Sequence, residues 1–118
     1  MPFRAISIDD DPMAILMVQK LTEKSGRVDL VNTYTDPVLG AAGIILDDPD
    51  ILFLDIEMPD FNGIQIMNAL KKPPKIIVIS SNPSYQQAAL DLNAVAFLHK
   101  PLDEASLKGA LDKIEKGE

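Results

Sequence analysis

Residues 3–11, Phe-Arg-Ala-Ile-Ser-Ile-Asp-Asp-Asp, run from an apolar segment directly into three consecutive acids. A second apolar run, residues 51–54, stops in the same way at Asp55. If both runs are neighbouring parallel strands, their acidic side chains share one edge of the sheet. Like charges held together raise one another's pKa and cost stability, so a cation is expected among them. A divalent metal ion and a lysine are the two candidates.

The rest of the chain alternates between apolar runs and helical stretches, which is typical of a parallel sheet with helices on both faces. Strands are expected near residues 3–8, 27–33, 51–55, 75–80 and 94–99. Helices are expected near residues 12–25, 37–46, 64–70 and 84–92, and from a cap at Asp103 through 114. Right-handed connections wind such units into a doubly wound sheet, whose ligand site lies at the carboxyl ends of the strands.

Length and composition restrict the function. The 118 residues suit one domain, spanning 1–118, that can bury its own core. The chain has no cysteine, which excludes thiol catalysis and thiolate metal sites. A net charge of -7 opposes direct binding to nucleic acid. No apolar stretch approaches the roughly 18 residues of a membrane span, so a cytoplasmic protein without membrane contact is expected.

Five polar residues are expected to converge on the carboxyl edge of the sheet: Asp9, Asp10, Asp55, Ser80 and Lys100. Magnesium prefers oxygen ligands and usually takes one or two carboxylates, which Asp10 and Asp55 can supply. Asp9 is better suited to holding a metal-bound water. The backbone carbonyl of Glu57, two residues after Asp55, is a further candidate ligand. The sequence therefore predicts a Mg²⁺ site.

The same edge has the groups that phosphoryl transfer requires. Asp55 is an oxygen nucleophile at a strand end, and carboxylates form covalent phosphate intermediates in proteins. Lys100 and the Ser80 hydroxyl can each meet a phosphoryl oxygen. Taken singly, these residues have ordinary interpretations as turn, loop or helix-capping residues. Their joint placement at one edge favours phosphoryl chemistry.

Over essentially its full length, the chain resembles the receiver domain of two-component response regulators. The resemblance rests on four motifs: Ile8-Asp9-Asp10-Asp11-Pro12, Leu54-Asp55-Ile56-Glu57-Met58-Pro59 followed by Gly63, Ser80, and Phe97-Leu98-His99-Lys100-Pro101. It implies a flavodoxin-like sheet of strand order 2-1-3-4-5 with five helices. It also implies that Asp55 accepts a phosphoryl group from a histidine kinase or phosphotransfer protein, with Mg²⁺ held by Asp9 and Asp10. Such a domain is a signalling module that catalyses only its own phosphorylation and dephosphorylation.

The resemblance assigns roles to further residues. Ser80 and Phe97 would form the switch that links phosphorylation to a change of conformation. Glu57 and Asn82 would tune the lifetime of the phosphoryl group, and the Lys100-Pro101 peptide bond would be cis.

The output or partner surface would be the face formed by the fourth helix, the fifth strand and the fifth helix. The expected contributors from that helix are Tyr85, Gln86, Ala89 and Leu90. A homodimer is one use of such a face. The sequences around Asp10 and Asp55 are also similar to those of receivers joined to LytTR-type DNA-binding domains.

Two alternatives remain open on the sequence alone. One is a Mg²⁺-dependent aspartyl phosphatase, which needs a second acid two residues after its nucleophile; Glu57 holds that position. The other is a pseudo-receiver, a binding module that takes no phosphate. The cognate kinase, the output and the oligomeric state cannot be inferred from the residues.

Overall fold

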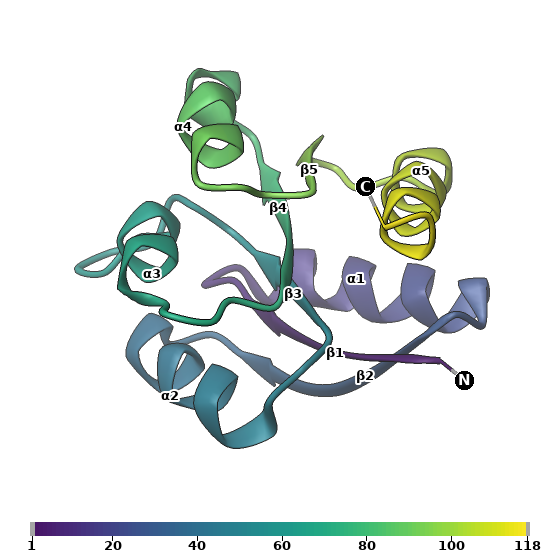
Figure 1. Cartoon of the computed structure of the whole chain (residues 1–118), viewed down its shortest axis with the longest axis horizontal. Coiled ribbons are helices and arrows are strands. Elements are labelled where there is room, and N and C mark those ends of the chain that lie inside the picture. The colour runs from purple at the N-terminus through teal and green to yellow at the C-terminus, as the bar shows by residue number, and fades with distance from the viewer. Residues whose placement is uncertain (1, 118) are drawn as a thin grey trace.

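Five parallel strands form one sheet in the order β2-β1-β3-β4-β5 in the computed structural model, which describes residues 2–117 (Figure 1). The strands are β1 (Phe3–Ile8), β2 (Val28–Tyr34), β3 (Ile51–Leu54), β4 (Lys75–Ser80) and β5 (Ala96–His99). The helices are α1 (Pro12–Ser25), α2 (Pro37–Asp47), α3 (Gly63–Ala69), α4 (Gln86–Asp91) and α5 (Glu104–Glu115), with a 3₁₀ turn η1 (Pro83–Tyr85) before α4. The flavodoxin-like order and the five helices expected from the sequence are confirmed.

The helices cover both faces of the sheet. Helices α1 and α5 lie on one face, and α2, α3 and α4 lie on the other (Figure 1). Because the central strands are buried on both sides, their alternate side chains enter two separate cores. Phe53 and Ile77 pack toward α1 and α5, whereas Leu54 and Val78 pack toward the opposite layer. Within residues 2–117, no helix is both long enough and apolar enough to span a membrane.

Short polar side chains fix where the helices begin. Asp11, Asp36, Asn62 and Asp103 each accept a hydrogen bond from a backbone N–H in the first turn of the helix that follows. Asn62 does so within a capping box, in which Gln65 accepts in return from the Asn62 N–H. These caps place the amino ends of α1 and α3 beside the carboxyl ends of β1 and β3.

The region of the fourth helix differs from the sequence prediction. The expected single helix over 84–92 is a 3₁₀ turn followed by only six α-helical residues. Asn82 caps Ser84, and Pro83 opens the tight turn. Ala89 is fully buried in the core, so it does not contribute to an exposed output face as the sequence suggested. Tyr85 is half-buried and Leu90 is exposed.

Gly63 brings the start of α3 against the end of β3. Its N–H donates to the Ile56 carbonyl at 2.9 Å. A Cβ atom at this position would lie 2.6 Å from the carbonyl oxygen of Asp55 and 2.8 Å from the Cα of Ile56. Both atoms belong to the backbone, so a side chain here could be accommodated only by moving the segment that carries Asp55.

Replacing Gly63 with alanine is therefore expected to lower the free energy of unfolding by about 1–3 kcal/mol, the usual cost of overpacking. Gly109→Ala in α5 is the matched control, because no atom lies within 4 Å of a Cβ there. That change should stabilise the protein by up to about 1 kcal/mol through helix propensity. Urea unfolding followed by circular dichroism measures both, and equal effects of the two substitutions would contradict the close approach at Gly63.

Candidate functional site

Three acidic side chains meet at the carboxyl edge of the sheet. Asp9 and Asp10 follow β1, and Asp55 follows β3; one carboxylate oxygen from each lies within 4.8 Å of the other two. Asp9 and Asp55 are buried, and Asp55 is only 4% exposed, whereas Asp10 is exposed. The Asp55 N–H donates to the Ile8 carbonyl at 3.0 Å, which ties the two strand ends together. The cluster is therefore held by the ends of two hydrogen-bonded strands at the centre of the sheet.

Lys100 reaches this cluster from the end of β5. Its Nζ lies 3.0 Å from Asp9 Oδ2 and 3.5 Å from Asp55 Oδ1, and the side chain is 20% exposed. The Lys100 N–H donates to the Ser80 carbonyl at 3.1 Å, so the ends of β4 and β5 are joined beside the site. The Lys100-Pro101 peptide bond is cis. The ammonium group is thus the cation that the acidic edge requires.

The electrostatics of the site raise the pKa of Asp55 to about 7. Burial is the main cause, followed by the negative charge of Asp9; the positive charge of Lys100 lowers it in part, and Asp10 raises it further. For Lys100, burial alone would lower the pKa, but the hydrogen bond and charge of Asp9, with Asp55, raise it overall. At neutral pH the lysine is therefore charged, and Asp55 is close to its titration midpoint.

A metal ion would complete this charge balance. The side-chain donors are all carboxylate oxygens, and the Glu57 backbone carbonyl stays a further candidate oxygen ligand; oxygen donors suit Mg²⁺ and not the softer metals. Asp9 already accepts from the Asp11 N–H at 2.9 Å through Oδ1 and pairs with Lys100 through Oδ2. Its position therefore suits an outer contact to a metal-bound water, while Asp10 and Asp55 would bind directly. The residues fit the ion.

The Ser80 hydroxyl is fully buried at the end of β4. Its oxygen accepts from the Asn82 N–H at 3.1 Å, so in this structure the hydroxyl is held by the loop that follows β4. The Asn82 side chain is also in use, because its Oδ1 accepts from the N–H and the hydroxyl of Ser84. Both residues lie at the same edge as the acidic cluster.

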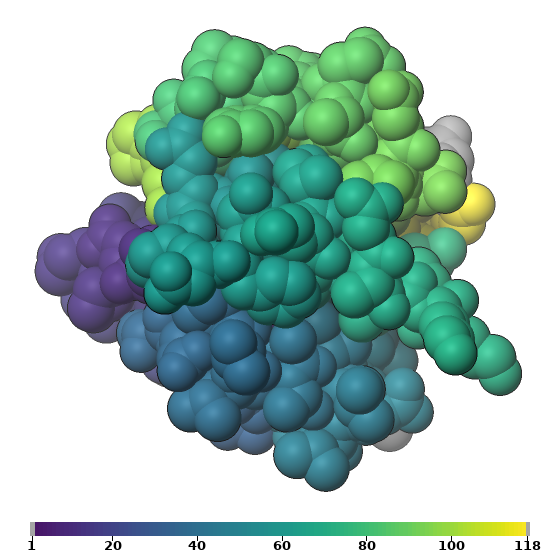
Figure 2. Space-filling view, turned by 90° about the vertical axis from the view of Figure 1, so that its left-hand side faces the viewer, coloured from purple at the N-terminus to yellow at the C-terminus, as the bar shows by residue number. Residues whose placement is uncertain are grey.

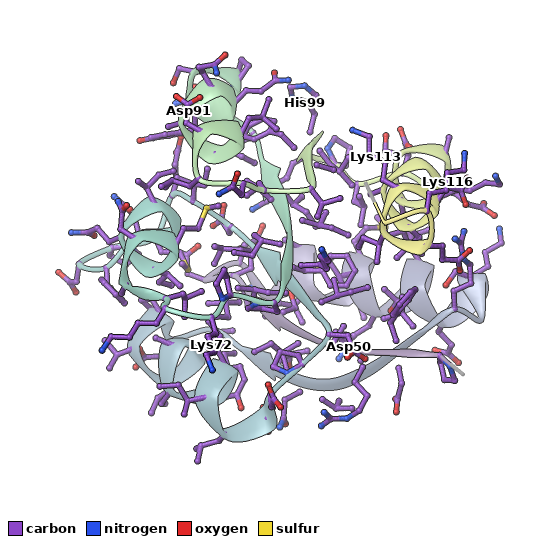
Figure 3. All side chains as sticks on the ribbon, viewed as in Figure 1. Asp50, Lys72, Asp91, His99, Lys113 and Lys116 are labelled. Carbon is purple, nitrogen blue, oxygen red and sulfur yellow. The ribbon has the colours of Figure 1, made fainter. Side chains whose placement is uncertain are left out.

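The remaining sequence-predicted residues lie outside the acidic cluster. The Glu57 side chain is exposed in the loop after β3. Phe97 is buried in the core between β5 and the α4 layer, and its ring meets His99 edge-on at a centroid distance of 5.5 Å. The His99 side chain points outward from the edge strand (Figure 3). Phe97 is thus in the core and not at the acidic edge.

One feature of the site was missed from the sequence. A pocket of about 330 Å³ opens beside Asp9 and Lys100, between the start of α1 and the segment after β5. Met13 and Met17 of α1 line it, with Pro101 and Leu102 opposite. Met13 is largely exposed. The sequence of α1 alone could not indicate this pocket, because its other wall is formed by Pro101 and Leu102, which are distant in the chain.

Comparison with known proteins agrees with this geometry. The family model described as the response regulator receiver domain matches residues 5–112. A response regulatory protein of Vibrio parahaemolyticus is 30% identical over 114 residues, covering 95% of this chain and 47% of the relative. The transcriptional regulatory protein LytR of Staphylococcus aureus is 28% identical over 114 residues, covering 94% of this chain and 46% of its own length.

Solved structures show the same similarity. The receiver domain of NarL from Mycobacterium tuberculosis superimposes with a TM-score of 0.87 at 27% identity, covering 99% of this chain and 98% of that one. The isolated receiver domain of RcsB from Salmonella enterica, studied with the phosphomimetic BeF₃⁻, gives a TM-score of 0.88 at 25% identity, covering 100% of this chain and 91% of that one. The chain belongs to the response regulator receiver domain family and is a receiver domain of a two-component response regulator. It spans about half the length of the curated relatives it matches.

Proposed function

We propose that this receiver domain accepts a phosphoryl group on Asp55 in a Mg²⁺-dependent reaction. The observation that supports this most is the position of the Asp55 carboxylate, which is buried beside two further acids and the Lys100 ammonium. A buried carboxylate with a pKa near 7 and a neighbouring cation is typical of a functional carboxylate. The donor would be a histidine kinase or a phosphotransfer protein.

In the transfer, an Asp55 carboxylate oxygen forms the new bond to phosphorus, and the bond from phosphorus to the donor atom breaks. A bound Mg²⁺ would neutralise charge on the attacking and transferred oxygens. Lys100 would meet a phosphoryl oxygen from the other side and move its ammonium away from Asp9 to do so. The side chains thus position the reacting groups and neutralise the charge on the phosphoryl oxygens, and these two effects account for most of the catalysis in phosphoryl transfer.

Ser80 and Phe97 would convert phosphorylation into a change of shape. The Ser80 hydroxyl would leave the Asn82 N–H and donate to a phosphoryl oxygen. Phe97 would then occupy the space vacated behind it; with no phenol hydroxyl, its position depends on packing alone. Phosphorylation would shift an existing equilibrium between two conformations. Glu57 and Asn82 would flank the phosphoryl group and set its lifetime.

The proposed output surface is the face of α4, β5 and α5. Leu90 is exposed there and Tyr85 is half-buried, so an apolar contact is available. The curated relatives are about twice as long as this chain, and LytR is a transcriptional regulatory protein. An output domain or a separate partner would therefore recognise this face, with a homodimer as a further use of it.

Two rival functions make different predictions. A Mg²⁺-dependent phosphatase would turn over small phosphate esters repeatedly, with Glu57 as its second acid. A pseudo-receiver would take no phosphate, and Asp55→Asn would leave its partner binding unchanged. The receiver predicts slow single-turnover labelling by acetyl phosphate, and partner binding that depends on Asp55.

Magnesium binding can be tested with two neighbouring acids. Saturating Mg²⁺ is expected to raise the melting temperature of the wild type, because it binds the folded cluster only. Asp10→Asn should weaken Mg²⁺ binding by at least about 10-fold, because loss of a direct carboxylate ligand costs no less than loss of an outer-shell partner. Asp11→Asn is the control: asparagine caps a helix as well as aspartate does. A titration by melting temperature measures both, and equal Mg²⁺ affinities for the two variants would contradict the assignment.

A further inference from the structure

A pocket of about 480 Å³ lies at the amino edge of the sheet, at the other end of the strands from the acidic cluster. The loop before β4, the end of α4, the segment before β5 and the last turn of α5 surround it. Its lining includes Pro73, Pro74, Lys75, Leu90 and Lys113. Figure 2 shows the loop before β4, in green-teal, projecting at the right, whereas the start of α1 lies at the left in purple. The pocket is therefore separate from the phosphoryl site.

The charged side chains that line this pocket are both positive. They are Lys75 and Lys113, which are exposed, and neither forms an ion pair with a carboxylate among residues 2–117. The pockets beside Asp9, Asp50 and Glu104, by contrast, each include an acidic side chain. Because the chain has 18 acids against 11 lysines and arginines, a pocket charged by lysines alone differs from the rest of this acidic surface.

The acidic residues next to this pocket in the chain are engaged elsewhere. Asp91, at the end of α4, accepts a hydrogen bond from the Gln87 side chain at 2.8 Å. Asp112, in the last turn of α5, pairs with Arg27 at 2.9 Å. Neither carboxylate lies within ion-pair distance of the two pocket lysines. The two ammonium groups are therefore available to an external anion.

The walls of the pocket are apolar. Pro73 and Pro74 have no backbone N–H to donate and fix the shape of the loop before β4. Leu90, which is 41% exposed, adds an aliphatic side chain. Sites for small molecules surround the ligand with a few fixed polar groups, whereas the charges here are the ends of two exposed, flexible side chains. Apolar walls with a charged rim are typical of a surface that binds another protein.

We propose that this pocket docks a short acidic segment of a partner protein, in which two carboxylates flank an apolar side chain. The carboxylates would pair with Lys75 and Lys113. The apolar side chain would pack against Pro74 and Leu90. Such a segment is complementary to the pocket in charge and in polarity.

The net charge of -7 does not prevent this contact. At physiological ionic strength the screening length is about 8 Å, so the acidic cluster at the far end of the strands has little effect on the pocket. A long polyanion such as nucleic acid would also meet the acidic surface around the pocket, which favours a short segment. The pocket adjoins the proposed output surface and shares Leu90 with it. Its lysines take no part in phosphoryl transfer, so docking does not depend on Asp55.

The test is an NMR titration of the ¹⁵N-labelled, unphosphorylated 118-residue chain with the peptide Gly-Glu-Leu-Glu-Gly, blocked at both ends. Two exposed ion pairs and one apolar contact predict a dissociation constant of about 0.1–1 mM. Amide shifts are expected at residues 73–75, 90–95 and 113. Replacing both glutamates of the peptide with glutamine should weaken binding at least about tenfold. Asp55→Asn should bind as the wild type does, which keeps this result separate from that of phosphorylation.

Lys113→Glu should weaken binding at least about tenfold, because a carboxylate at the pocket repels the peptide. Lys20→Glu is the matched control, since it makes the same change of net charge at an exposed position of α1 and should leave the affinity within about twofold of the wild type. Melting curves verify that both variants fold. Raising the salt concentration from about 0.1 M to about 1 M should weaken binding, because the screening length falls from about 10 Å to about 3 Å.

Three results would overturn the proposal. The first is the absence of shifts at the pocket residues up to about 10 mM peptide, well above the expected dissociation constant. The second is equal weakening by Lys113→Glu and Lys20→Glu, which would mean that net charge and not the pocket decides binding. The third is a twelve-nucleotide DNA strand that shifts the same residues at a lower concentration than the peptide, which would make the pocket a nucleic-acid contact.

Discussion

Replacing Lys100 with methionine is expected to slow phosphorylation of Asp55 by about 10²–10³-fold, the usual effect of removing one group that stabilises developing charge. In the structure its ammonium lies 3.0 Å from Asp9 and 3.5 Å from Asp55. Without it, the phosphoryl oxygens would lose the positive charge that Lys100 supplies. The pKa of Asp55 would also rise further, because the positive charge of Lys100 lowers it. Less of the ionised nucleophile would then be present at neutral pH.

The measurement is the rate of labelling by acetyl phosphate at saturating Mg²⁺, followed by intact mass. Lys75→Met is the control, because Lys75 is an exposed lysine at the start of β4, the opposite end of the sheet. It should label at the wild-type rate. If Lys100→Met labelled within about threefold of the wild type, the role of Lys100 in positioning and neutralising the phosphoryl group would be wrong.

Asp55→Asn is expected to stabilise the metal-free protein at pH 8 but not at pH 4. The pKa of Asp55 is about 7 in the folded chain against an ordinary value of 3.8, because of burial and then the charge of Asp9. The folded state therefore binds the proton more tightly than the unfolded state. Stability falls as the pH rises from about 4 to about 7 and then levels off. Asparagine does not ionise, so the stability of the variant does not fall in this way as the pH rises.

At pH 8 the free energy of unfolding of Asp55→Asn is expected to exceed that of the wild type by about 2 kcal/mol, allowing for screening by water at the open side of the site. Urea unfolding at pH 4, 6 and 8, with and without Mg²⁺, measures it. Saturating Mg²⁺ should reduce the difference, since the ion pairs with the wild-type carboxylate. Asp60→Asn is the control: it replaces an exposed carboxylate at a position of positive φ, where asparagine fits well, and keeps Asp55. Its stability should therefore follow the same pH dependence as that of the wild type. A wild type more stable than Asp55→Asn at pH 8 without metal would contradict the electrostatic account.

The fold followed from sequence because its signals are local. Apolar runs of four to seven residues mark the strands. Asp11, Asp36 and Asp103 mark the helix starts, because their side chains accept hydrogen bonds from backbone N–H groups of the first turn. The strand ends shifted by one or two residues, since β5 begins at Ala96 and not Ala94. The topology of the sheet then determines which residues lie at its carboxyl edge. The side chains that meet there are those of Asp9, Asp10, Asp55 and Lys100.

Other features depend on contacts between distant segments. The burial of Ala89 and the shortness of α4 arise from packing against the sheet, which no local pattern reports. The same holds for Gly40 and Gly43 of α2, whose close approach to Ile8 and Tyr34 arises from packing against the sheet. The hydrogen bond from the Asn82 N–H to Ser80 likewise became visible only in three dimensions.

The most direct test of the proposed function is intact mass after incubation with acetyl phosphate and Mg²⁺. The wild type is expected to gain the mass of one phosphoryl group. Asp55→Asn should gain none, and Asp60→Asn should gain one, because its exposed carboxylate lies outside the cluster. Chelation of Mg²⁺ should abolish the gain. An equal mass gain by the wild type and Asp55→Asn, or none by the wild type with Mg²⁺ present, would show that Asp55 is not the phosphoacceptor.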